Sequence, residues 1–203
     1  MTRSLLALAL FAVYLGTAFG LRTWKHLRTT GKTGFQGISG RPGSASWWGG
    51  VLFVVALVLG FAAPLLELAG LVDPLVVPNA LISALGVVVT AAGITLTLWA
   101  QGAMGASWRV GVRESERTEL VTTGPFALVR NPIFSFMLLT AAGLSLLLPN
   151  VVTLASAGCL LVAIEIQVRV VEEPYLLRTH GEPYATYCRC VGRFVPGLGL
   201  RGP

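Results

Sequence analysis

The chain has 203 residues, of which 54% are apolar and 12% are charged, and its net charge is +6 at pH 7. Because a typical soluble domain carries roughly 25% charged residues, this chain has too little polar surface to coat a water-soluble globule of its size. The mean hydropathy of +0.75 leads to the same conclusion. The composition excludes an ordinary soluble domain and predicts an all-α integral membrane protein.

Five apolar stretches are long enough, or nearly long enough, to cross the hydrocarbon core, which takes about 20 helical residues. They are residues 4–21, 48–71, 78–100, 133–148 and 151–168. The fourth and fifth stretches are joined only by Pro149 and Asn150, which predicts a tight helical hairpin. Four glycines in the spans are expected to allow close helix approach: Gly86, Gly93, Gly143 and Gly158.

Charge placement predicts how the spans are oriented, because short cytoplasmic loops hold most Lys and Arg residues. All 15 Lys and Arg residues except Arg3 lie in the segments that follow the first, third and fifth spans. We therefore expect a multi-pass cell-membrane protein with its N-terminus outside and its C-terminus in the cytoplasm. Since the basic residues punctuate apolar runs instead of forming one stripe, we expect no nucleic-acid partner.

Cysteine and histidine residues give little sign of a metal or disulfide site. Cys159, Cys188 and Cys190 supply neither a disulfide framework nor four metal ligands, and His180 is isolated from other candidate ligands. The sequence therefore predicts no metal site.

Polar residues gather in two blocks, and the first covers residues 117–132. Within it, Gly124-Pro125 is a turn signal, and Pro132 suits the first turn of the fourth span with Asn131 as its N-cap. The N-terminus of a helix offers unpaired N–H groups to a carboxylate or another anion. This block is therefore a candidate binding loop at a membrane entry point.

The second block begins inside the fifth span at Glu165. Steps of four and three residues predict that Glu165, Arg169 and Glu172 share one helical face. Because an ionisable group in a span needs a partner, we expect Glu165 to pair with Arg169. Further on, Tyr184 and Tyr187 are three residues apart, a spacing typical of aromatic packing on one helix face.

Together the two blocks resemble the isoprenylcysteine carboxyl methyltransferase family, within the wider group of membrane methyltransferases that includes phospholipid methyltransferases. The matching pieces, in chain order, are Leu120-Val121, Gly124, Phe126, Arg130-Asn131-Pro132, Glu172-Glu173, Gly181, Tyr184, Tyr187, and Arg193 with Pro196. The likeness covers roughly residues 85–197, and the order and spacing of the pieces are together fairly specific. Two positions depart from the family: Asn131 replaces the usual His, and Arg169 stands three residues before the Glu pair instead of four.

The resemblance implies a five-span membrane protein whose cytoplasmic C-terminal helical region binds S-adenosyl-L-methionine. Residues 1–80 would form an N-terminal two-span region and residues 81–203 the methyltransferase core. The implied cofactor-binding residues are Thr118, Glu119, Leu120, Val121, Phe126, Arg130, Asn131, Pro132, Ile133, Phe134, Glu172, Tyr184 and Tyr187. The implied catalytic residues are Arg169, which would bind the acceptor, and Glu172, which would close the cofactor pocket.

Within this family the sequence favours carboxyl O-methylation of an apolar or isoprenoid-like acceptor, because an Arg can hold a carboxylate through two parallel hydrogen bonds. Phospholipid N-methylation stays open, since the choice of acceptor depends on a lateral pocket that the sequence does not show. Two other classes are an NADPH-dependent membrane reductase of the steroid or sterol type and a non-catalytic membrane subunit. Selective NADPH binding would favour the reductase, and binding of neither cofactor would favour the non-catalytic subunit.

Overall fold

The computed structural model describes residues 2–34, 37–38, 40–105, 108 and 119–201. In these residues the chain is helical, and its β-structure is limited to an isolated bridge between Val129 and Gly192. The helices are α1 (Thr2–Leu15), η1 (Gly16–Leu21), α2 (Arg22–Thr30), α3 (Ala45–Leu68), α4 (Ala80–Ala103), η3 (Gly124–Ala127), α5 (Pro132–Leu147), α6 (Val151–Ile166), η4 (Gln167–Glu172), α7 (Glu173–His180) and α8 (Glu182–Cys190). The predicted all-α fold is confirmed.

The predicted spans correspond to apolar helices in chain order. Among the described residues, four helical stretches are long and apolar enough to cross a membrane, namely Thr2–Thr30, Ala45–Leu68, Ala80–Ala103 and Val151–His180. Helix α5 is shorter, with 16 residues or about 24 Å. The first and fifth helical stretches continue past their predicted ends, because the π-helical segments η1 and η4 join them without a break to α2 and α7.

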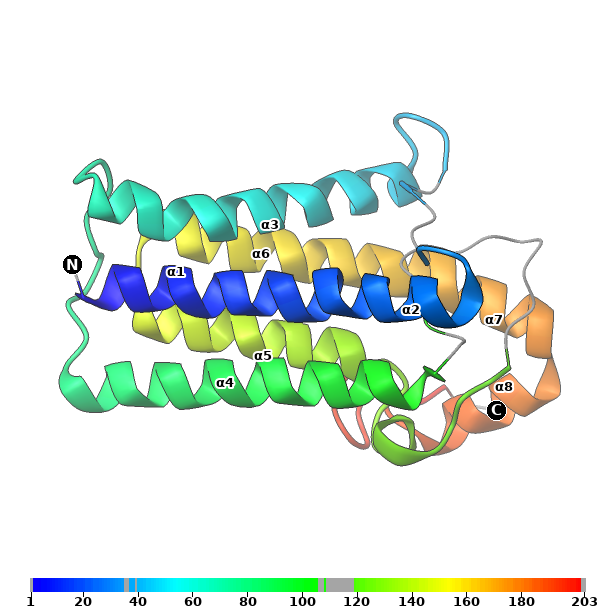
Figure 1. Cartoon of the computed structure of the whole chain (residues 1–203). Helices are drawn as coiled ribbons and strands as arrows, with labels where there is room; N and C mark the ends of the chain where they lie inside the picture. Colours follow the sequence, from blue (N-terminus) through cyan, green and yellow to red (C-terminus); the bar gives the residue numbers. More distant parts are fainter. Residues whose placement is uncertain (1, 35–36, 39, 106–107, 109–118, 202–203) are drawn as a thin grey trace.

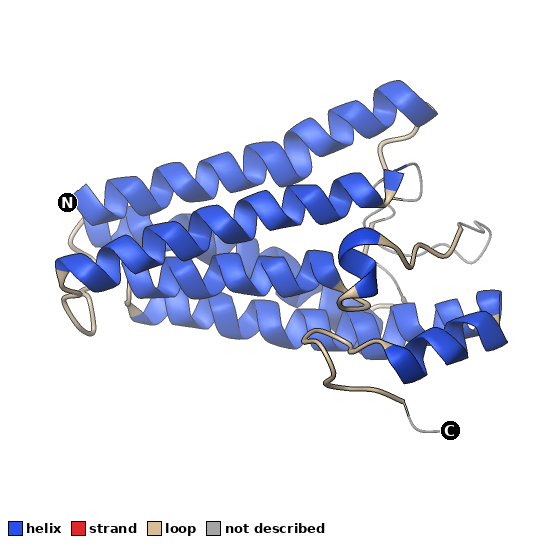
Figure 2. Cartoon of the chain, turned by 90° about the horizontal axis from the view of Figure 1, so that it is seen from below, coloured by secondary structure: helices blue, strands red, loops and turns tan. Residues whose placement is uncertain are grey.

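The helices lie side by side, and the two chain termini lie at opposite ends of the bundle (Figures 1 and 2). One end, here called the N-terminal end, holds the start of α1, the α3–α4 connection and the α5–α6 turn. The other end, the α7/α8 end, holds α2, α7, α8 and the C-terminal segment. An odd number of crossings requires this arrangement, and it brings both polar blocks to the same end.

Helices α4 and α5 pack closely because glycines face the neighbouring backbone. A Cβ atom on Gly143 would lie 2.4 Å from the backbone nitrogen of Thr90, and one on Gly86 would lie 2.8 Å from that of Leu147. The predicted role of glycine in close helix approach is confirmed at these positions. It is wrong for Gly158, where a Cβ atom would meet nothing within 4 Å.

At the N-terminal end a polar network joins α1, α3 and α6. The side chain of Asn150 caps α6 by accepting a hydrogen bond from the backbone N–H of Thr153 at 2.9 Å, which confirms the tight hairpin. The same side chain donates to Glu67 Oε2 at 2.9 Å, and the Ser4 hydroxyl donates to Glu67 Oε1 at 3.0 Å. The network closes this end of the bundle.

Candidate functional site

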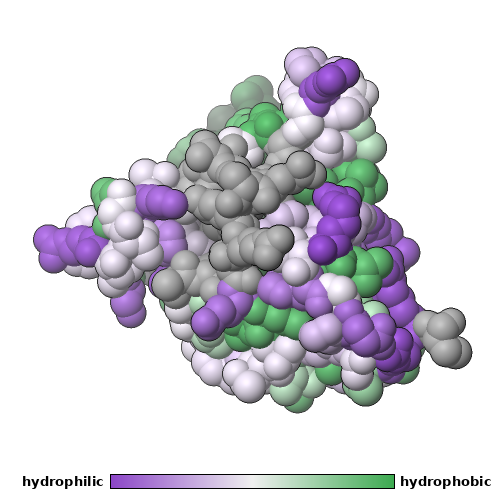
Figure 3. All heavy atoms as spheres, turned by 90° about the vertical axis from the view of Figure 1, so that its right-hand side faces the viewer, coloured by the Kyte–Doolittle hydropathy of each residue, from purple (hydrophilic) through white to green (hydrophobic). Residues whose placement is uncertain are grey.

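A cavity of about 550 Å³ lies among the helix ends at the α7/α8 end, and we call it the wide cavity. Its size is within the usual range for small-molecule sites, about 300–1,000 Å³. Its walls come from α1, η1, α3, α4, η3, α5, α6, η4 and α7 and from the loops beside them, so widely separated parts of the sequence contribute to one space. Seen from this end, hydrophilic side chains form several groups on the surface (Figure 3).

Most of the predicted cofactor-binding residues line the wide cavity. These residues are Glu119, Leu120, Val121, Phe126, Arg130, Asn131, Pro132, Ile133, Phe134 and Glu172. Thr118 lies outside the described residues. The structure thus brings the loop before α5, the start of α5 and the end of η4 to the same space.

Tyr184 and Tyr187 do not line the wide cavity but support its wall from behind. The Tyr187 hydroxyl donates to the carbonyl of Phe126 at 2.5 Å, and the two tyrosine rings lie 6.2 Å apart. Burial raises the pKa of Tyr187 well above its usual value, so the hydroxyl keeps its proton and remains a donor. In this structure the pair positions Phe126.

The start of α5 is tied to the C-terminal segment rather than capped by its own side chain. The Asn131 side chain makes no capping bond and instead donates to the carbonyl of Arg193 at 3.2 Å. The Ser135 hydroxyl donates to the carbonyl of Phe194 at 2.8 Å. Asn131 is the N-cap residue of α5 and Pro132 stands in its first turn, as predicted. The expected capping bond from the Asn131 side chain is absent, because that side chain turns towards the C-terminal segment and links it to the cavity wall.

A buried carboxylate, Glu173, collects three arginines beside the wide cavity. Arg130 Nη2 lies 3.0 Å from Glu173 Oε1, Arg193 Nε lies 2.7 Å from the same atom, and Arg201 Nη2 lies 3.4 Å from Oε2. Arg130 also donates to backbone carbonyls of the C-terminal region, those of Cys188, Val191 and Gly199. Glu173 thus anchors the C-terminal segment against α5, a role that the sequence motif did not reveal.

The π-helical segment η4 separates two residues that the sequence placed on one face. Arg169 pairs with Glu165, as predicted, but its side chain is 56% exposed and does not line the wide cavity. Glu172 does line it, and Gln167 Nε2 donates to Glu172 Oε1 at 3.3 Å. The shared-face prediction was wrong because η4 is π-helical. Its backbone hydrogen bonds span five residues instead of four, so Glu172 is rotated away from the face on which a regular α-helix would place it with Arg169.

Sequence reasoning also missed two residues that line the wide cavity, Gln101 and Trp108. Gln101 lines the wide cavity from α4, is 4% exposed, and donates through Nε2 to the carbonyl of Ala18 at 2.9 Å. Trp108, which is 2% exposed, contributes its ring, over which the guanidinium of Arg22 lies at 5.0 Å. The signal for Gln101 was available, since a polar residue at the end of an apolar span is itself a candidate for function.

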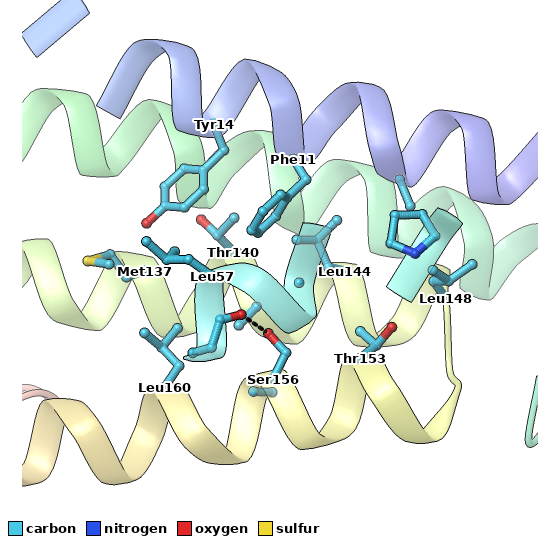
Figure 4. Close-up of a pocket in the computed structure, with 16 residues that line it drawn as sticks. Phe11, Tyr14, Leu57, Met137, Thr140, Leu144, Leu148, Thr153, Ser156 and Leu160 are labelled. Atoms are coloured by element: carbon cyan, nitrogen blue, oxygen red, sulfur yellow. Dashed lines mark hydrogen bonds between the residues drawn. The ribbon is translucent and has the colours of Figure 1, made fainter. Parts of the chain in front are cut away.

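A second, smaller cavity of about 30 Å³ lies deeper in the bundle. Leu57 and Met137 line both cavities and therefore separate them. Phe11 and Tyr14 point into this space from α1, and Ser156 donates to the Ala56 carbonyl at 2.7 Å beside it (Figure 4). A space of this volume holds a water molecule or two but no lipid chain, so the wide cavity is the candidate ligand site.

The described residues show no group of three or more His, Cys, Asp or Glu side chains that could hold a metal ion. The residues that converge on the wide cavity are instead apolar side chains together with carboxylates, amides and one arginine. Such a lining suits an organic ligand with an apolar part and a cationic or hydrogen-bonding part.

Comparison with known proteins places this arrangement in context. The fold is similar to that of a eukaryotic intramembrane Ras methyltransferase, isoprenylcysteine carboxyl methyltransferase, with a TM-score of 0.64 and 18% sequence identity over 95% of this chain. The match covers 66% of that protein, so this chain spans just under two thirds of its length. Curated protein sequences give no significant match. The phospholipid methyltransferase family matches residues 81–183, which are just over half of the chain, and the chain therefore belongs to that family.

Proposed function

We propose that this protein is an integral membrane methyltransferase that takes a methyl group from S-adenosyl-L-methionine and transfers it to a lipid-like or isoprenoid acceptor bound in the wide cavity. The observation that carries the proposal is the convergence of the family-motif residues on one cavity. These residues are distant in sequence yet line the same space: residues 119–121, Phe126, residues 130–134 and Glu172.

The residues present fit such a cofactor. S-adenosyl-L-methionine would supply a methyl group already activated on a cationic sulfonium. Carboxylates from Glu119 and Glu172 line the cavity and attract a cation, while Leu120, Val121 and Phe126 offer an apolar surface for a flat heterocycle. The C-terminal segment, held by Glu173, supports this wall from outside.

Methyl transfer by in-line displacement asks the protein mainly to align donor and acceptor and to exclude water. The wide cavity offers apolar walls for this purpose, with Leu15, Phe53 and Ile164 extending it into the bundle. A hydrocarbon part of the acceptor would bury against such apolar walls, and its polar group would meet the polar side chains that line the cavity. Both parts of the chain, residues 1–80 and 81–203, would contribute to this one site.

The proposal covers carboxyl O-methylation and phospholipid N-methylation. The sequence favoured the first reaction through a clamp by Arg169, whose side chain does not line the cavity. Arg130 does line it, but donates both Nη nitrogens to Glu173 and to C-terminal carbonyls. Among the described residues, no arginine that lines the cavity keeps both Nη nitrogens for a carboxylate, so the choice of acceptor needs another argument.

The α7/α8 end would face the cytoplasm, where S-adenosyl-L-methionine is available. The support for this orientation is that every Lys and Arg except Arg3 lies in the segments after the first, third and fifth spans. Labelling of single cysteines with an impermeant reagent, at the two ends in turn, would test it.

Calorimetric titration of the detergent-purified protein with S-adenosylhomocysteine, and separately with NADPH, tests the proposed function. We expect the wild type to bind S-adenosylhomocysteine, and Glu172→Gln to weaken that binding about tenfold, the loss of roughly one charged hydrogen bond. The matched control is Glu165→Gln, which removes a half-buried carboxylate seven residues away that does not line the cavity. Binding of NADPH alone would favour a reductase, and binding of neither ligand a non-catalytic subunit.

A further inference from the structure

Gln101 is the polar residue of the wide cavity that comes from α4, where its neighbours on the wall include Leu15, Phe19 and Trp108. Its side chain is held at one end only. Nε2 donates to the carbonyl of Ala18 at 2.9 Å, a bond that joins α4 to the π-helical segment η1 across 83 residues of sequence.

This bond fixes which way the amide of Gln101 is turned. The oxygen and nitrogen of an amide have nearly the same shape, but a backbone carbonyl accepts hydrogen bonds and never donates them. Nε2 must therefore face Ala18, and Oε1 is left on the other side. Oε1 is buried and has no hydrogen-bond partner among the described residues.

A buried acceptor without a donor costs free energy, so native proteins rarely retain one unless water or a ligand completes it. The cavity that Gln101 lines is large enough for a ligand. The two carboxylates on the same cavity wall, Glu119 and Glu172, are also acceptors when ionised. Gln101 Oε1 therefore requires a donor from whatever fills the space.

We propose that Gln101 is a specificity residue for the methyl acceptor, with Oε1 accepting a hydrogen bond from an N–H or O–H group of its headgroup. This inference rests on the proposed function and deepens it by naming an acceptor class. The class is an amphiphile with an amine or hydroxyl headgroup. An ionised carboxylate has no proton to donate and would place like partial charges against Oε1.

The transfer balances without a further reactant. A lone pair on the acceptor nitrogen or oxygen forms the new bond to the methyl carbon, and the methyl–sulfur bond breaks with its electron pair remaining on sulfur. The proton of the methylated amine or hydroxyl then leaves to water. The part of Gln101 is to orient the headgroup so that the lone pair points towards the methyl group.

The test uses two amphiphiles of equal chain length and equal charge, dodecylammonium and dodecyltrimethylammonium, of which only the first donates hydrogen bonds. The affinity of each is measured by calorimetry on the detergent-purified protein with S-adenosylhomocysteine present. The measured quantity is the ratio of the two dissociation constants. Partitioning into detergent affects this ratio equally in every variant, so it cancels in the comparison.

We expect the wild type to prefer dodecylammonium about tenfold, and Gln101→Leu to reduce that preference to about twofold or less. Gln101→Met, which has a matched length and no amide, should behave in the same way and replaces the Leu variant if that one unfolds. The control is Thr97→Val, one turn earlier on α4, where a buried hydroxyl bonds to its own helix and does not line the cavity. This control should keep the full preference.

The outcomes separate this inference from the proposed function. Loss of the preference in both Gln101 variants, with S-adenosylhomocysteine affinity within twofold of wild type, supports the assignment. An unchanged preference in these variants overturns it and leaves Oε1 to a water molecule. Failure of the wild type to bind S-adenosylhomocysteine would overturn the proposed function itself, whatever the amphiphile titrations show.

Discussion

The two ends of the bundle each contain buried polar side chains, and they differ in what those side chains leave unsatisfied. At the N-terminal end, Ser4, Glu67 and Asn150 bond to one another, and Asn150 also caps α6. The atom left without a partner there among the described residues is Arg3 Nη1, which belongs to neither this network nor a cavity wall. At the α7/α8 end, Gln101 Oε1 and Arg130 Nε are buried without partners among the described residues. A network in which the side chains bond to one another makes a fold more rigid. Polar atoms of a cavity wall that lack a partner can instead form hydrogen bonds with a ligand.

Glu173 shows that the α7/α8 end also contains structural polar groups, in this case one carboxylate with three arginines. Its carboxylate is 1% exposed and binds Arg130, Arg193 and Arg201. The hydrogen bonds to Glu173 raise the pKa of the Arg193 guanidinium, which therefore stays charged beside this carboxylate. Substitutions in the Glu173 cluster should therefore change both the stability of the fold and ligand binding. Substitutions at the N-terminal end should change stability alone.

The largest effect should come from Glu173→Gln, which removes the charge at the centre of this cluster. Breaking a buried ion pair from one side leaves cations uncompensated and costs about 3–5 kcal/mol. We expect a clear drop of the thermal unfolding temperature, followed by tryptophan fluorescence, and loss of S-adenosylhomocysteine binding. Glu182→Gln is the control, because Glu182 pairs with Arg189 on the surface and should leave both quantities unchanged. Equal effects of the two variants would contradict the conclusion that Glu173 anchors the C-terminal segment through its three arginines.

Gly143→Ala should have the next largest effect, and on stability alone. The new Cβ atom would lie 2.4 Å from the Thr90 backbone, so α4 and α5 must separate at a cost of about 1–3 kcal/mol. The site is remote from the wide cavity wall, so the affinity for S-adenosylhomocysteine should change less than threefold. Gly158→Ala, in open space on α6, should instead leave stability equal or slightly higher. Comparable unfolding temperatures for the two variants would argue against glycine-mediated contact.

Asn150→Ala opens the closed network of the N-terminal end. It removes the cap of α6 and a donor to Glu67, which should cost about 1–2 kcal/mol. Asn79→Ala is the matched control, since Asn79 caps α4 through the backbone N–H of Ile82 but is exposed, and its side chain makes no second hydrogen bond within the described part of the chain. We expect the control to lose less stability, and neither variant to change S-adenosylhomocysteine affinity by more than twofold. A large loss of ligand affinity in Asn150→Ala would show that the two ends are coupled.

The sequence was sufficient for the parts of this protein that depend on local pattern. Apolar length predicted the spans, and Pro149-Asn150 predicted the hairpin that Asn150 now closes. The motif around residues 119–134 lines the cavity because its members are close in sequence and are followed directly by α5. These features need only helical geometry and the hydrophobic thickness of a membrane.

Contacts between distant segments were beyond the sequence pattern. Asn131 was expected to cap α5, but the competing carbonyl of Arg193, 62 residues further on, takes its side chain. Gln101 acquires its fixed orientation from Ala18, on a helix that no motif connects to it. The π-turn in η4 has no signature in apolar periodicity, so a regular α-helix placed Arg169 and Glu172 on one face.

Arg169→Gln should have the smallest effect and tests this difference in register directly. The arginine side chain is 56% exposed and pairs with Glu165, and such a surface pair is worth about 0–1 kcal/mol. We expect the unfolding temperature to change little and the dissociation constant of S-adenosylhomocysteine to change less than twofold. Glu172→Gln, only three residues further along, should weaken the same binding about tenfold because its carboxylate lines the cavity. A tenfold loss in Arg169→Gln as well would mean that the two residues act on one side of the helix after all, as a regular α-helix would place them.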